Sequence, residues 1–87
     1  MISVTVLYFA SFRERLGLEK ETIEIWGTIK NIADLKQLLV NRQDVWEDIF
    51  GIESNVLISI NQNMAKNHSV ISDLDEIAFS PPSLVDK

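Results

Sequence analysis

The sequence contains no cysteine and only one histidine, His68. Without cysteine the chain cannot form a disulfide, a catalytic thiolate or a cysteine-rich zinc site. A single histidine needs convergent partners to bind a metal, and the nearby Asp73 and Asp75 fall in a turn-like stretch. We therefore expect no metal ion and no cofactor, and we interpret His68 as an exposed loop residue.

Glycine is also scarce, and positive charge is in deficit. Gly17, Gly27 and Gly51 are widely spaced, which excludes phosphate-binding loops that need clustered glycines. The formal net charge is −5, from 13 acidic and 8 basic residues, and this charge disfavours nucleic acid as a partner. No apolar run approaches the roughly 20 residues of a membrane span, and no signal peptide is visible. These features predict a cytoplasmic protein without a membrane anchor.

Strand and helix patterns alternate along the 87 residues. Strands are predicted where β-branched and aromatic residues alternate with others, over 2–9, 21–26, 55–60 and 76–80. Apolar residues at helical spacing predict a main helix over 29–41, with Thr28 or Asn31 as its N-cap. Shorter helical pieces are expected at 10–16 and 44–50, and a short return strand at 64–66.

The β-β-α-β-β order predicts an α+β fold in which one main helix packs across a mixed sheet, the β-grasp or ubiquitin-like architecture. We expect this domain to span residues 1–82, with its first and last strands as parallel neighbours. Two adjacent prolines favour an extended tail over 83–87. Trp26 and Trp46 are expected in the core or at its edge. The predicted core comprises Val4, Val6, Ile23, Ile25, Leu35, Leu38, Ile58, Ile60, Ile77 and Phe79.

The first strand is apolar on both faces near its end. Tyr8 and the valines before it are expected under the helix, which leaves Leu7 and Phe9 on the opposite face of the sheet. An open sheet face is normally polar. We therefore predict that Leu7 and Phe9, together with Met64, form a hydrophobic surface for a partner protein. The alternative is that flanking loops cover Phe9.

Three stretches of the sequence form a recognisable set. They are Tyr8-Phe9-Ala10 followed by Arg13-Glu14 and Gly17, then Ile60-Asn61-Gln62, then Asp75-Glu76-Ile77-Ala78-Phe79 leading to Pro81-Pro82. Together they resemble the molybdopterin synthase small subunit, the MoaD family, over essentially the whole chain. The resemblance implies a small sulfur carrier whose C-terminal carboxylate is activated with ATP by an adenylyltransferase related to ubiquitin-activating enzymes. The carboxylate then becomes a thiocarboxylate.

The resemblance also implies a partner. The loaded tail inserts into the large subunit of molybdopterin synthase, so the chain is a non-catalytic small subunit with no catalytic residues of its own. The residues implied at this interface, besides Leu7, Phe9 and Met64, are Arg13, Ser80, Pro81 and Pro82. Ser80 stands where the family often has a second aromatic residue, which weakens the expected contact. The tail itself comprises Ser83, Leu84, Val85, Asp86 and Lys87.

Family members end in Gly-Gly, whereas this sequence has Val85 and Asp86 at the matching positions, followed by Lys87. Glycine lets a backbone pass through a narrow channel and approach ATP closely, and the bulk of Val85 and the charge of Asp86 oppose both. We therefore expect the chain as printed not to carry sulfur competently through this tail. One alternative is a β-grasp protein-binding module without sulfur-transfer chemistry. A thiamine-type sulfur carrier matches the double-proline ending less well.

Overall fold

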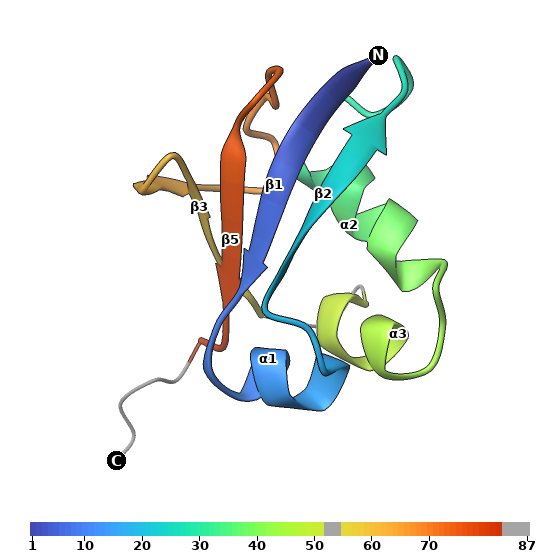
Figure 1. Ribbon diagram of the computed structural model, residues 1–87, viewed down its shortest axis with the longest axis vertical. Helices are drawn as coiled ribbons and strands as arrows, with labels where there is room; N and C mark the ends of the chain where they lie inside the picture. Colours follow the sequence, from blue (N-terminus) through green and yellow to red (C-terminus); the bar gives the residue numbers. More distant parts are fainter. Residues whose placement is uncertain (52–54, 83–87) are drawn as a thin grey trace.

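The computed structural model describes residues 1–51 and 55–82, and its elements follow the predicted order (Figure 1). The strands are β1 (Ile2–Tyr8), β2 (Lys20–Ile25), β3 (Leu57–Ile60), β4 (Asn63–Ala65) and β5 (Glu76–Ser80), and the helices are α1 (Ala10–Leu16), α2 (Ile32–Val40) and α3 (Val45–Phe50). One sheet has the strand order β2-β1-β5-β3-β4. β1 and β5 run parallel, with Thr5 opposite Glu76 and Tyr8 opposite Phe79. The predicted mixed sheet with a parallel central pair is confirmed.

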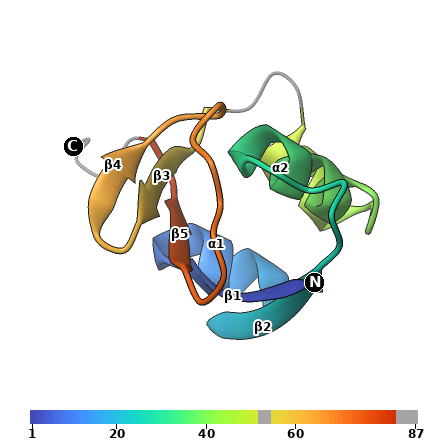
Figure 2. The same ribbon diagram turned by 90° about the horizontal axis from the view of Figure 1, so that it is seen from above.

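The helices α2 and α3 cover one face of this sheet, and α1 lies at the end where β1 and β5 finish (Figures 1 and 2). Side chains therefore alternate between a buried and an open side. In β1 the residues Val4, Val6 and Tyr8 are buried, whereas Leu7 between them is only half-buried. Among the described residues, the opposite face of the sheet thus has no helix across it.

Local signals explain where α2 begins and ends. The side chain of Asn31 accepts a hydrogen bond from the backbone N–H of Asp34 at 2.9 Å, which caps the helix N-terminus. Asp34 in turn accepts from the backbone N–H of Lys30 at 3.0 Å. The helix is therefore shorter than the predicted 29–41. Just beyond it, Gln43 and Asp44 both have positive φ, which ends the helical path.

The core differs from the prediction at two positions. Leu38 and Ile60 are half-buried, because Leu38 lies beside the buried stripe of α2 and Ile60 is the last residue of β3, next to the edge strand β4. The other eight predicted core residues are buried, and sequence analysis missed Phe12, Ile32, Leu39, Ile49, Phe50 and Ile71. The prediction that Trp26 lies in the core or at its edge is wrong. Trp26 is 67% exposed, because it follows β2 on the outward side of the sheet.

An aromatic cluster joins the helices to the end of the sheet. Phe50 of α3 lies edge-on to Phe79 of β5, with ring centroids 4.9 Å apart, and 6.0 Å from Phe12 of α1. Tyr8 stacks near Phe79 and meets Trp46 edge-on at 5.5 Å. Aromatic burial is the largest apolar contribution available to a small domain. The cluster therefore anchors the end of the sheet at which β5 leads into the C-terminal prolines.

Candidate functional site

The uncovered side of the sheet carries a row of side chains that crosses all five strands. The register places Leu7 opposite Lys20 of β2 on one side and Ala78 of β5 on the other. Ser59 of β3 is opposite Ala78, and Met64 of β4 is opposite Ser59. The structure therefore brings Leu7 and Met64 onto one face, as predicted, but sets two strands between them.

A second row lies one step closer to the end of β5. Here Ser80 is opposite Leu57, and Phe9 continues the outward alternation of β1 with an extended backbone. Phe9 is 45% exposed, Leu57 38% and Met64 78%. The exposure of Phe9 agrees with the prediction, and the alternative that flanking loops cover it is wrong. We call the outward surface at this end of the sheet the open face; it is made by Leu7, Phe9, Leu57, Met64, Ala78 and Ser80.

The remaining predicted interface residues lie around this surface. Arg13 is an exposed residue of α1, and its backbone carbonyl accepts the hydrogen bond that ends the helix at Gly17. Pro81 is half-buried and Pro82 exposed, directly after β5. Ser83, Leu84, Val85, Asp86 and Lys87 lie outside the described residues.

Sequence analysis missed Leu57 and Ala78 on the open face. The signal was available, because Leu57 alternates with the correctly predicted core residue Ile58, and Ala78 lies between the core residues Ile77 and Phe79. Strand alternation assigns each residue to a face. Which of these residues form one row across the sheet depends on the register between strands, and the alternation within a single strand does not define that register.

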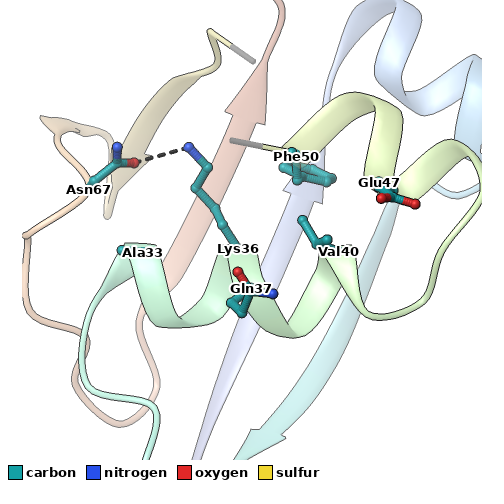
Figure 3. Close-up of a pocket in the computed structure, with 8 residues that line it drawn as sticks. Ala33, Lys36, Gln37, Val40, Glu47, Phe50 and Asn67 are labelled. Atoms are coloured by element: carbon teal, nitrogen blue, oxygen red, sulfur yellow. Dashed lines mark hydrogen bonds between the residues drawn. The ribbon is translucent and has the colours of Figure 1, made fainter. Parts of the chain in front are cut away.

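The helix side of the molecule has a separate hollow of about 450 Å³ between α2, α3 and the segment around Asn67 (Figure 3). Lys36 reaches across it and donates a hydrogen bond to Asn67 Oδ1 at 3.1 Å. Burial lowers the pKa of Lys36. Glu47 and Phe50 line the opposite wall. The polar side chains that line the hollow are those of Lys36, Gln37, Glu47 and Asn67, and Lys36 is already hydrogen-bonded to Asn67, so we assign no reaction to it.

A polar cluster closes the other flank of the helix layer. The Tyr8 hydroxyl donates to Glu21 Oε2 at 2.7 Å, and Arg42 donates to both Glu21 oxygens at 2.8 and 3.1 Å. The Arg42 guanidinium lies 4.4 Å from the Trp46 ring centroid. Burial and the bond to Glu21 raise the pKa of Tyr8 far above its ordinary value. All partners are paired, so this cluster fixes the α2–α3 corner onto the sheet.

Within residues 1–51 and 55–82, no group of three or more histidine and carboxylate side chains is placed to hold a metal ion. His68 is exposed, as expected. No helix in these same ranges has the length and apolar character needed to cross a membrane. The open face is therefore the candidate site considered further, because register brings exposed apolar side chains from different strands onto one surface.

Comparison with known proteins finds relatives over most of the chain. Residues 6–83 match the model of the ThiS family. The chain is 30% identical over 80 residues to the molybdopterin synthase sulfur carrier subunit of Haemophilus influenzae, covering 91% of this chain and 94% of that protein. It is 32% identical to the protein of the same name from Mycobacterium tuberculosis, covering 93% and 94%.

The fold is shared with solved structures. The putative molybdopterin converting factor, subunit 1, from Pyrococcus furiosus superposes with a TM-score of 0.78 at 24% identity, over 94% of this chain and 99% of that one. This likeness confirms the β-grasp fold predicted from the order of elements. The resemblance drawn from the sequence motifs is confirmed as well. Because the ThiS family model matches residues 6–83, which are most of this chain, the chain belongs to the ThiS family.

Proposed function

We propose that this chain is the small, sulfur-carrier-type subunit of a molybdopterin synthase, and that its tail as printed does not carry sulfur competently. The observation that carries the proposal is its identity of about 30% with two molybdopterin synthase sulfur carrier subunits, over more than 90% of both chains. A carrier needs a stable body, a docking surface and a reactive terminus, but no catalytic constellation. The described residues offer the first two.

The open face is the proposed contact with the large subunit. Phe9 and Leu57 lie in the row next to the end of β5, where the chain continues through Pro81 and Pro82. A protein seated on the open face therefore also reaches Pro81, which directly follows Ser80. The contacts of Arg13 and Ser80 with that protein stay predictions.

The proposed chemistry takes place at the C-terminal carboxylate. A ubiquitin-activating-like adenylyltransferase joins the carboxylate to the α-phosphorus of ATP, and pyrophosphate leaves. Hydrosulfide, supplied by a sulfide donor, then attacks the acyl carbon and displaces AMP, which gives the thiocarboxylate. The large subunit transfers this sulfur to its substrate. The chain contains no cysteine that could hold sulfur as a persulfide instead.

The test compares two forms of the protein. One ends at Lys87 as printed, and the other has Val85→Gly and Asp86→Gly and lacks Lys87. Each is incubated with the adenylyltransferase of the same organism, ATP and a sulfur donor, and intact mass is measured. We expect the glycine form alone to gain the mass of one oxygen-to-sulfur exchange, because side-chain bulk and the charge of Asp86 hinder approach to ATP.

The other outcomes also decide. If the printed form exchanges equally well, the Gly-Gly argument is wrong and the carrier function stands. If neither form exchanges, carrier chemistry is refuted. Binding of the large subunit by both forms would then favour a protein-binding module without sulfur transfer, since the open face does not depend on the tail.

A further inference from the structure

The hairpin that carries Met64 has weak support of its own. β4 is three residues long, lies at the edge of the sheet and pairs with β3 alone. Its two loop residues, Asn61 and Gln62, both have positive φ, at 51° and 72°. Two-residue hairpin loops of this kind usually contain glycine, because a Cβ disfavours such backbone. The ladder between β3 and β5 holds β3 in place, so the loop and β4 are the parts of the hairpin that need further contacts.

Asn61 supplies those contacts. Its Nδ2 donates to Asp75 Oδ1 at 2.9 Å, and its Oδ1 accepts from the backbone N–H of Glu76 at 2.9 Å. Its own backbone N–H donates to the Glu76 carbonyl at 2.7 Å. One residue of the hairpin loop is thus tied three times to the beginning of β5.

Asp75 extends the same connection to β1. It is 9% exposed, and its second carboxylate oxygen accepts from the backbone N–H of Ser72 at 2.8 Å. Its carbonyl accepts from the backbone N–H of Thr5 at 3.0 Å. A carboxylate this well buried is costly unless hydrogen-bonded. The Asn61–Asp75 pair therefore joins the edge hairpin, β5 and β1 at one point.

We propose that Asn61 and Asp75 are positioning residues for the open face: together they hold the turn end of the β3–β4 hairpin against the beginning of β5 and so fix Met64 relative to the rest of the open face. The inference rests on the proposed binding of the large subunit to this face. Neither residue is a member of the open face, so both act through the residues it contains. A shift of the hairpin by one residue would turn Met64 to the other side of the sheet.

The pair allows a sharp test, because amide and carboxylate are nearly equal in shape. In Asn61→Asp, two carboxylates face each other. In Asp75→Asn, either orientation of the new amide sets one N–H donor against another, from Asn61 or from Ser72. The double variant Asn61→Asp with Asp75→Asn restores all of these hydrogen bonds with the donor reversed. Gln62→Glu adds one charge to the same exposed loop and serves as the control.

Two measurements are made on the full chain. Amide hydrogen exchange of β4 and of Glu76, without a partner, reports how well the hairpin is held. Affinity for the large subunit of molybdopterin synthase reports the open face. In each single variant we expect these amides to exchange at least tenfold faster and the Kd for the large subunit to rise at least tenfold. In the double variant and in Gln62→Glu we expect both quantities to stay within threefold of the native chain.

A double-mutant cycle separates positioning from a general loss of stability. Combined with Asn61→Asp, Met64→Ala should cost little further affinity, whereas Phe9→Ala should keep its full cost. Unchanged single variants, or a double variant that is not rescued, would overturn the proposal. If the native chain itself fails to bind the large subunit, the proposed function fails, and the exchange data alone still decide whether the pair holds the hairpin.

Discussion

Phe9 gives the strongest single test of the open face. A phenylalanine side chain buries about 150–250 Å² when fully covered, so a Phe9 that is 45% exposed has roughly 90 Å² left for a partner to cover. At about 25 cal/mol per Å² this area corresponds to about 2 kcal/mol. Phe9→Ala should therefore raise the Kd for the large subunit about thirtyfold. Phe9→Asp should cost more, because it places a charge in an apolar contact.

Both substitutions should leave the fold intact. Phe9 occupies the N-cap position of α1 and makes no side-chain capping bond there, so truncation removes none. Aspartate is a favoured N-cap residue, which offsets the loss of apolar contact in Phe9→Asp. Thermal unfolding and two-dimensional NMR spectra are expected to remain close to those of the native chain.

The assay is isothermal titration of each variant with the large subunit. Trp26→Ala is the matched control, because Trp26 is an exposed aromatic residue at the opposite end of the sheet, beyond Ile25 of β2. It should leave the affinity unchanged. A folded Phe9→Ala variant whose Kd rises less than threefold, or an equal effect of Trp26→Ala, would refute the assignment of the open face.

Two further predictions concern stability. Burial alone would raise the pKa of Glu21, but bonds from Arg42 and Tyr8 outweigh it and lower that pKa below its ordinary value of 4.5. The stability that Glu21 contributes is therefore present above pH 4.5 and is lost as the pH falls through the pKa of Glu21 in the folded state. Tyr8→Phe removes one of the bonds that lower this pKa, so the free energy of unfolding, measured in urea from pH 7 to pH 3, should fall less steeply with pH in that variant. Asp44 has φ 55° and ψ −128°, a region suited to glycine, so Asp44→Gly should raise the free energy of unfolding by about 1 kcal/mol, whereas Asp44→Ala should give no gain.

The sequence predicts the side of a strand on which a residue lies better than it predicts which residues of different strands become neighbours. Alternation is a local property, so Leu7 is assigned to the outward side from β1 alone, and the exposure of Trp26 follows from the alternation it shares with Glu24. Residue type favours burial of tryptophan, and here alternation outweighs it. Which outward residues become neighbours depends on register between strands, and turns and loops define that register.

The aromatic cluster shows the opposite case. α3 has only six residues, too few for a helical period to show which side is buried. Phe50 is buried because α3 folds back onto Phe79 of β5, about 30 positions away in the chain. Such contacts are properties of the assembled layers. A pattern confined to residues 44–50 carries no trace of them.

The motifs that carried the family resemblance divide into two physical roles. Phe9 has an exposed apolar side chain, as expected of a residue that contacts a partner protein. Asn61 and Asp75 are polar, and their side chains form hydrogen bonds with the backbone and with each other. Asn61 also tolerates its positive φ better than most residues with a Cβ would. A surface built across four strands needs both roles, because apolar contact residues on an edge hairpin bind a partner only as well as the hairpin is held.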